Sequence, residues 1–115
     1  MKKEKVIIKY GEKEIKIEVG LCRFLNQLRG LMFTKRIKAR AILFNFRKKS
    51  RPTIHSYFVF FPFIAVWLNE KNKVIDHGII APFKLWIIPD KPCYSLLEIP
   101  INKYYRERGL IEWFL

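Results

Sequence analysis

The amino-acid sequence predicts a mainly β protein, either a β-sandwich or a barrel-like fold, with one or two short helices. Ten Phe, five Tyr and three Trp residues, together with many Ile residues, favour strands because aromatic and β-branched side chains pack well on a pleated surface. Several short segments also alternate apolar and charged residues with the two-residue period of a half-buried strand. Of the 115 residues 50% are hydrophobic, so residues 1–115 are expected to form a single domain with its own core.

The N-terminal segment has the pattern of a β-hairpin followed by a helix. Residues 5–10 and 13–19 are the two expected strands, and the Gly-Glu pair between them is the expected turn. In residues 21–28 the Leu and Phe residues recur at the spacing of a short amphipathic helix, which Gly30 is placed to end.

More strands and a second short helix are expected further along the chain. Residues 35–40 are expected to form an exposed connection, residues 69–73 a polar turn, and residues 102–109 one or two helical turns. The expected strands, apart from those of the apolar segment described next, are residues 41–46, 74–80, 93–99 and 110–115.

Residues 57–68 form an uninterrupted run of twelve apolar residues in the middle of the chain. A membrane-spanning helix needs about 20 such residues, so this run is too short to cross a bilayer. As one strand it would extend roughly 40 Å, which is longer than a domain of this size is wide. We therefore expect a bend at Pro62 between two strands, residues 56–61 and 63–68, both buried on two faces in the centre of a sheet.

The order of five motifs is similar to that of a known protein family. In sequence order they are RGLMF (29–33), ILFNF (42–46), IHSYFVFFPFIAVWLN (54–69), VIDHGIIAPFK (74–84) and LLEIP (96–100). Together they resemble the domain of unknown function 192 family, found in bacteria and archaea, over nearly all of residues 30–110. The resemblance implies a small β-rich, sandwich-like fold. It implies no activity, because none is established for that family.

The chain departs from the family pattern at positions where glycine or a polar residue is expected. Ala41 and Asn102 stand for glycines, and Ile64 stands where the family has an aspartate. A carboxylate buried in a sheet is costly unless it is paired or binds something, so the family aspartate is the first site candidate. Ile64 cannot ionise, accept a hydrogen bond or bind a metal. We therefore predict that position 64 faces a dry apolar core.

The charge of the chain is strongly positive and unevenly distributed. Lys and Arg number 23 against 10 Asp and Glu, which gives a formal net charge of +13, and residues 19–69 contain no acidic residue. Such a surface attracts polyanions, either nucleic acid or anionic lipid, and a solvated basic face is the alternative. The cations lie in two connections that flank one expected strand, so they could form one patch. The candidate anion-binding residues are Lys35, Arg36, Lys38, Arg40, Arg47, Lys48, Lys49, Arg51 and His55.

Catalytic signatures are absent from the sequence. It has no G-x-S-x-G or H-E-x-x-H motif and no glycine-rich phosphate loop. Asp76 and His77 are adjacent on an expected strand, so their side chains should point to opposite faces. A metal site would require these two, His55, Glu98 and the cysteines to converge, which nothing in the sequence supports. We predict no catalytic residue, metal or cofactor, and we expect Glu98 to pair with an Arg or Lys.

The two cysteines, Cys22 and Cys93, do not form a C-x-x-C pair, which argues against a zinc ribbon or a thioredoxin-type site. We expect two buried thiols in a reducing, cytoplasmic setting, with one disulfide as the alternative. Trp67, Trp86 and Trp113 are expected to pack in or near the core.

The sequence therefore indicates a non-enzymatic binding or accessory module whose basic face meets an anionic partner. A nucleic-acid-binding protein is the alternative, and a hydrolase or metal-dependent enzyme is less favoured. The possible partner is nucleic acid or another polyanion, and no transmembrane segment is expected.

Overall fold

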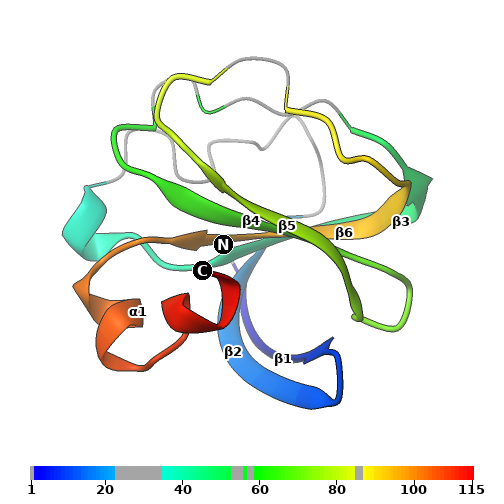
Figure 1. Cartoon of the computed structure of the whole chain (residues 1–115), viewed down its shortest axis with the longest axis horizontal. Coiled ribbons are helices and arrows are strands. Elements are labelled where there is room, and N and C mark those ends of the chain that lie inside the picture. Colours follow the sequence, from blue (N-terminus) through cyan, green and yellow to red (C-terminus); the bar gives the residue numbers. More distant parts are fainter. Residues whose placement is uncertain (1, 23–34, 53–55, 57–58, 85–86) are drawn as a thin grey trace.

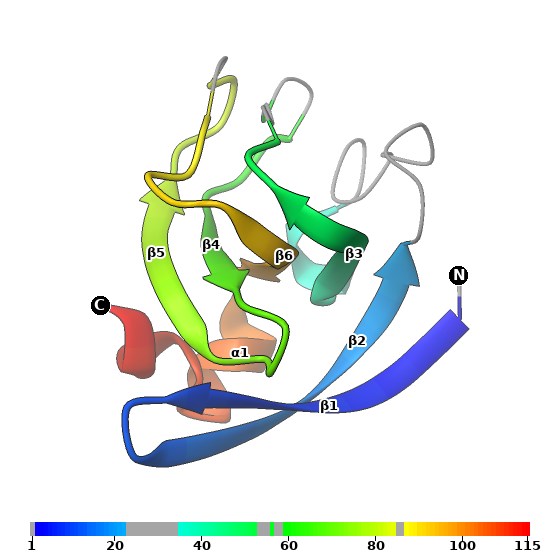
Figure 2. The same cartoon turned by 90° about the vertical axis from the view of Figure 1, so that its right-hand side faces the viewer.

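In the computed structural model, residues 2–22, 35–52, 56, 59–84 and 87–115 are described, and a curved sheet of six strands dominates them (Figure 1). The strand order is β1-β2-β3-β6-β4-β5, in which β2 and β3 are parallel and the other neighbours are antiparallel. The strands are β1 (Lys2–Tyr10), β2 (Lys13–Cys22), β3 (Ile42–Ser50), β4 (Phe63–Leu68), β5 (Val74–Ile80) and β6 (Cys93–Pro100). The short helices are η2 (Arg36–Lys38), α1 (Lys103–Glu107) and η3 (Ile111–Phe114). Figure 2 shows the sheet curled into a half-barrel, which confirms the predicted mainly β, barrel-like fold.

β1 and β2 form the predicted hairpin. They pair from Lys2 with Leu21 to Tyr10 with Lys13, and Gly11 turns the chain at a φ of 62°. β2 continues to its end at Cys22 because Leu21 extends the strand's inward-facing apolar row, and residues 20–22 pair with β3. The helix predicted for residues 21–28 therefore does not begin at Leu21, and the rest of that segment lies outside the described residues.

The apolar middle of the chain supplies one central strand rather than two. β4 lies between β6 and β5 with all six side chains buried, as predicted for residues 63–68. The strand predicted for residues 56–61 is wrong, because its described residues form no strand. The Ser56 hydroxyl donates to the Ala81 carbonyl oxygen at 2.8 Å and accepts from the Lys84 amide at 2.6 Å. These bonds fix the segment to the loop after β5 instead of to a neighbouring strand.

The sheet carries one apolar layer on each face. The inner layer fills the half-barrel and includes Ile8, Val19, Leu43, Ile64, Leu97 and Tyr105. The outer layer includes Phe44, Phe61, Phe63, Trp67, Cys93 and Leu96. Ile64 has an exposed fraction of 0%, so the predicted dry apolar surroundings of this position are confirmed. Among the described helices, none is long and apolar enough to cross a bilayer.

A backbone hydrogen bond and three aromatic side chains join β1 and β5, the two edge strands of the curled sheet. The Lys9 amide donates to the Asn72 carbonyl oxygen at 2.9 Å, which links β1 to the turn before β5. The Tyr10 hydroxyl lies 2.7 Å from Nε2 of His77, and the Phe114 ring packs against both rings. This edge contact explains why residues 110–115 form η3 rather than the predicted final strand, since the helical turn brings Phe114 into the gap. We refer to Tyr10, His77 and Phe114 as the seam.

The C-terminal segment corrects one prediction about the tryptophans. Trp67 is buried in the outer layer as expected, but Trp113 lies on the outer side of η3 and is 37% exposed. The Lys13 ammonium group lies 4.5 Å above the Trp113 ring and covers it in part. Trp86 lies outside the described residues.

Asn102 ties α1 to the connection that leads into β3. Its side-chain oxygen accepts from the Tyr105 amide, and its Nδ2 donates to the carbonyl oxygens of Arg36 and Ala39, both at 2.9 Å. The Tyr105 hydroxyl in turn accepts from the Ala41 amide at 2.6 Å. The residue that replaces a family glycine is therefore an N-cap that also satisfies two carbonyl groups of a neighbouring segment.

Candidate functional site

The inward-facing rows of three strands change from apolar to polar at the same end of the half-barrel. Alternate residues of a strand share a face, so each row can be followed from the inner layer outward. The rows run from Ile8 through Val6 to Glu4 in β1, from Leu43 through Asn45 to Arg47 in β3, and from Leu97 to Ser95 in β6. This end lies away from α1, which packs at the start of β3 through Tyr105.

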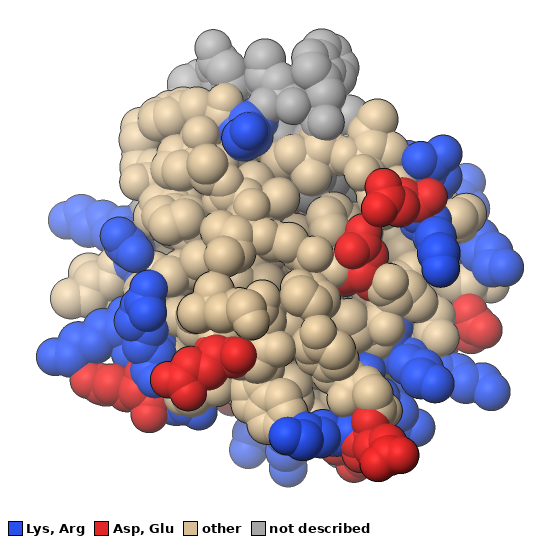
Figure 3. All heavy atoms as spheres, in the orientation of Figure 1, with Lys and Arg blue, Asp and Glu red and all other residues tan. Residues whose placement is uncertain are grey.

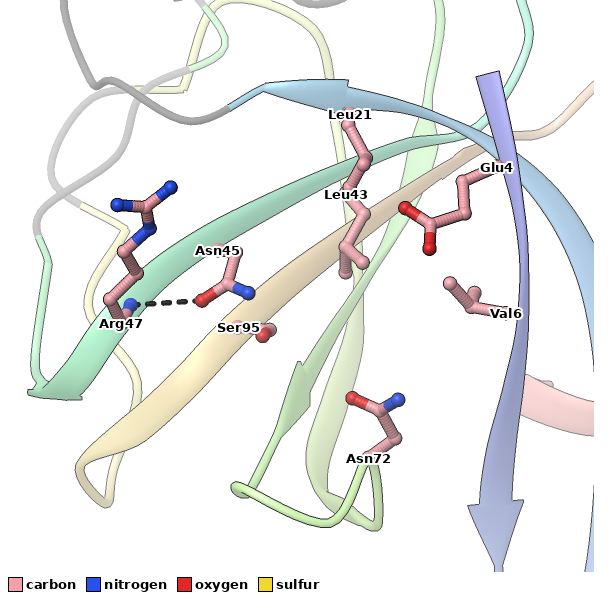
Figure 4. A pocket seen from close by; sticks show the side chains of 8 residues that line it. All are labelled: Glu4, Val6, Leu21, Leu43, Asn45, Arg47, Asn72 and Ser95. Atoms are coloured by element: carbon pink, nitrogen blue, oxygen red, sulfur yellow. Dashed lines mark hydrogen bonds between the residues drawn. The ribbon is translucent and has the colours of Figure 1, made fainter. Parts of the chain in front are cut away.

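The polar ends of these rows surround a pocket of about 270 Å³ (Figure 4). Leu21, Leu43 and Val6 give it an apolar floor. Its polar lining comes from Glu4, Asn45, Arg47, Asn72 and Ser95. Five of the eight lining residues are polar, and convergent polar groups in a concave surface are a feature of small-molecule sites, so we take this pocket as the candidate functional site.

The backbone at Arg47 is bent so that β3 departs from regular pairing there. The pairing of β3 with β6 shifts register between Asn45 and Ser50, and Arg47 has a left-handed φ of 59°. The Asn45 side-chain oxygen accepts from the Arg47 amide at 2.9 Å and so stabilises the bend. Bulges of this kind re-aim side chains and are common beside functional sites.

Asn72 repeats this feature on the opposite wall of the pocket. It also has a φ of 59°, and its carbonyl oxygen accepts from the Lys9 amide at 2.9 Å. Asparagine tolerates the left-handed region better than most residues, and arginine does not. Two of the three non-glycine residues with positive φ in the described chain therefore line the pocket.

Several polar groups of the pocket have no hydrogen-bond or ion-pair partner among the residues that the structure describes. Ser95 is only 5% exposed, yet no side chain or backbone group in the described ranges hydrogen-bonds to its hydroxyl. The Glu4 carboxylate and the Arg47 guanidinium form no ion pair with any described residue. The Ser95 hydroxyl oxygen keeps some solvent access, so water or a ligand in the pocket can complete its hydrogen bonding.

The predicted anion-binding residues fall into two groups at the two ends of β3. The first group precedes β3, in and around η2 beside α1, and the second occupies the last part of β3 and the residue just after it. The first group is Lys35, Arg36, Lys38 and Arg40, and the second is Arg47, Lys48, Lys49 and Arg51. A strand of nine residues spans roughly 30 Å, and the space-filling view shows Lys and Arg on both sides of the molecule (Figure 3).

The structure thus places these cations apart rather than in one patch. Of the eight, Arg47 lines the pocket. Arg36 donates through Nε to the Ile101 carbonyl oxygen at 2.8 Å, and Arg51 donates to the Pro89 carbonyl oxygen at 3.0 and 3.2 Å. His55 lies outside the described residues.

Glu98 and Trp67 are two buried side chains with polar atoms on the outer face of the sheet. Glu98 is 7% exposed and lies between Ile42 and Ala65 of the neighbouring strands. The Arg or Lys partner expected for it is not found among the described side chains. Burial raises the pKa of Glu98 to about 8. Nε1 of Trp67, also on this face, is buried without a hydrogen-bond partner in the described structure.

The remaining reactive side chains lie away from the pocket. Nε2 of His77 faces Tyr10 in the seam, while an Asp76 carboxylate oxygen accepts from the His77 amide. Cys93 is a free thiol in the outer layer, where burial raises its pKa to about 11. In the parts of the chain that are described, no three His, Cys, Asp or Glu side chains gather as they would around a metal ion.

Sequence reasoning found Arg47 but missed Glu4, Asn45, Asn72 and Ser95. The sequence contained a signal for Glu4, Asn45 and Ser95, because each is a polar residue in the row of a strand whose other members are apolar and face inward. Asn72 sits in a turn, where asparagine is common, so its sequence context gave no such signal.

The curved sheet and its pocket define a small β half-barrel with a polar site at one end of its inner face. The sequence model of the DUF192 family, described as "Uncharacterized ACR", matches residues 6–110, and the chain belongs to this family. The resemblance seen in the motif order is thereby confirmed.

One relative in sequence and two solved structures are similar to the chain, and the two structures share its fold. The chain is similar to the UPF0127 protein TK1120 of Thermococcus kodakarensis, with 27% identity over 96 residues, and spans 78% of its own length but 60% of that protein. A crystal structure of a "putative transcription regulator" from Sinorhizobium meliloti matches 95% of this chain and 88% of that one, at a TM-score of 0.76 and 16% identity. A protein of unknown function from Novosphingobium aromaticivorans matches 92% of this chain and 78% of that one, at a TM-score of 0.71 and 17% identity.

Proposed function

We propose that residues 1–115 act as one non-enzymatic binding module whose pocket takes a small ligand through an anionic group. The observation that carries this proposal is a pocket of about 270 Å³ whose lining contains both the Arg47 side chain and a Ser95 hydroxyl that has no hydrogen-bond partner among the described residues. A guanidinium group offers a fork of donors that matches carboxylate and phosphate oxygens. The bend at Arg47 orients this residue at the pocket rim.

The chemistry of the lining favours binding over turnover. The pocket contains a carboxylate, a guanidinium group, two amides and a hydroxyl, but neither His nor Cys. Ser95 has no base within hydrogen-bond reach among the described side chains, so nothing there activates it as a nucleophile. The net charge of +13 would raise the local concentration of anions at the mouth of the pocket.

Replacing Arg47 with Gln is expected to weaken the binding of small carboxylates and inorganic phosphate about tenfold, because the charged donor fork is lost. Chemical-shift titration by NMR with hexanoate and phosphate measures this directly. Lys49→Gln is the matched control, since Lys49 is an exposed cation near the end of the same strand and does not line the pocket. Equal weakening by both substitutions would show that bulk charge, and not the pocket, holds the anion.

A nucleic-acid phosphate backbone is the second candidate partner, and one side-chain cluster favours it. The guanidinium groups of Arg40 and Arg108 lie 3.7 and 3.5 Å from the Tyr104 ring centroid. Groups this close to one centroid must occupy opposite faces of the ring. Tyr104 therefore holds two cations in fixed positions next to the other basic residues of η2 and α1. The fold shared with a "putative transcription regulator" adds support.

If this surface binds duplex DNA through about six phosphates, log affinity is expected to fall with log salt concentration at a slope of roughly −5. Fluorescence anisotropy across a salt series measures the slope. The double variant Arg40→Gln, Arg108→Gln should flatten it, whereas Arg47→Gln should change it little. An affinity independent of salt, or no binding at low salt, would remove this candidate.

A cytoplasmic location is also part of the proposal. The free thiol of Cys93 supports it, because reducing compartments keep thiols unpaired.

A further inference from the structure

The pocket carries opposite charges on its two sides. Figure 4 shows the Glu4 carboxylate on one side and the Arg47 guanidinium on the other, with Leu21 and Leu43 between them in this view. Neither charge is neutralised by another side chain in the described ranges. A purely anionic ligand would meet attraction from Arg47 and repulsion from Glu4, so the pair of charges selects among anions.

The strand register shows that the two charges are far apart. Glu4 pairs with Val19, which lies two residues before Leu21, and Leu21 pairs with Leu43, which lies four residues before Arg47. At about 3.3 Å per residue the two backbones are separated by at most roughly 20 Å along the strand direction, because the bend at Arg47 shortens the path. Even with both side chains reaching inward, a ligand whose charges are adjacent cannot contact Glu4 and Arg47 together.

The space between the charges has an apolar part and a polar part. Val6, Leu21 and Leu43 form the apolar floor, and in the view of Figure 4 Asn45 and Ser95 lie between Leu43 and Arg47. A methylene chain lying on this floor would bury apolar surface, and its charged ends would point to the two walls.

From this arrangement we propose that the ligand is an extended zwitterion of the ω-amino acid type. Its carboxylate binds Arg47, its ammonium group binds Glu4, and its methylene chain covers Val6, Leu21 and Leu43. Ser95 and the amides of Asn45 and Asn72 supply further hydrogen bonds. The inference rests on the proposed anion-binding function of the same pocket and adds the second charge and the chain length.

The test compares probes of one chain length that differ only in their charged ends. Isothermal titration calorimetry with 6-aminohexanoate, hexanoate and hexylamine is expected to show that 6-aminohexanoate binds about five-fold tighter than either singly charged probe. Glycine, with adjacent charges, is expected to bind more weakly than 6-aminohexanoate. Affinity should rise from glycine through 4-aminobutyrate to the six-carbon and eight-carbon amino acids.

Substitutions separate the two ends of the ligand. Glu4→Gln should reduce the affinity for 6-aminohexanoate to that for hexanoate and should leave or improve hexanoate binding. Glu12→Gln is the matched control, because Glu12 is an exposed acid at the hairpin turn and does not line the pocket. Glu4 is exposed, so its variant is expected to keep the wild-type melting temperature.

The outcomes distinguish this inference from the function on which it rests. If hexanoate binds as tightly as 6-aminohexanoate and Glu4→Gln has no effect, the proposal of a zwitterionic ligand is overturned. The proposal of an anion-binding site is then unaffected. If no carboxylate or amino acid in the series binds at millimolar concentration, both fall together.

Discussion

Replacing Ile64 with Asp is expected to destabilise the protein by about 4–5 kcal/mol at neutral pH, which is enough to unfold a large part of the population of a marginally stable domain. Ile64 has no exposed surface, lies in the central strand β4, and pairs in register with Ile99 and Ile79. A carboxylate there would have no Lys, Arg or His partner among the described residues of the inner layer. Urea unfolding followed by circular dichroism measures the change.

One further variant and a pH series on the Asp variant show whether charge is the cause. Ile64→Val should cost only about 0.5–1.5 kcal/mol, because it removes one methylene group. The Asp variant should recover part of its stability as the pH falls from the raised pKa of the buried carboxyl group toward about 4, the pKa of Asp in the unfolded chain, because in this range the folded state holds a proton that the unfolded chain releases. An Asp variant as stable as the Val variant would mean that water or a cation reaches this face of the sheet.

Glu98 is expected to make the protein less stable as the pH rises from about 5 to about 8. Burial raises the pKa of Glu98 from its usual value of 4.5 to about 8, so in this range the folded protein keeps a proton that the unfolded chain releases. The unfolded state binds fewer protons, and the free energy of unfolding therefore falls with increasing pH. The full loss across this range is of order a few kcal/mol.

Glu98→Gln should remove this pH dependence and raise the stability near pH 8, since the amide imitates the protonated carboxyl group without being able to ionise. Urea unfolding at several pH values, with wild type and variant side by side, tests it. Glu18→Gln serves as the control, because Glu18 is an exposed acid of β2. A wild-type stability that stays level or increases over this range would contradict the burial of an unpaired carboxyl group.

The strands with strong local alternation could be predicted from the sequence. The hairpin, β4, β5 and β6 all lie where periodicity or an apolar run placed them. The strand predicted for residues 56–61 was wrong because Val59 and Phe61 pack in the outer layer without forming a strand. The bonds of Ser56 to the 81–84 loop that hold this segment cannot be read from the local sequence pattern. The strand predicted for residues 110–115 was wrong for a similar reason, because Phe114 packs against Tyr10 and His77, which come from strands distant in the sequence.

The candidate site was only partly predictable, because the curl of the sheet creates it. Glu4, Arg47 and Ser95 come from three strands far apart in the sequence, and single-sequence patterns do not report how such strands meet. Counting charges located Arg47 but could not separate it from Lys35, which lies beyond the other end of β3. The polar interruption of inward-facing rows is the feature that distinguishes the two.

The seam has a consequence for how a molecule enters the pocket. β1 meets β5 through one backbone bridge and the contacts of Tyr10, His77 and Phe114, whereas the neighbouring strands elsewhere in the described sheet share ladders of backbone hydrogen bonds. Separating β1 from β5 costs less free energy than separating any other two neighbouring strands, so local opening of the half-barrel will begin between them. Glu4 and Val6 move with β1. The opening motion that lets a ligand enter therefore also moves these two lining residues away from the rest of the pocket.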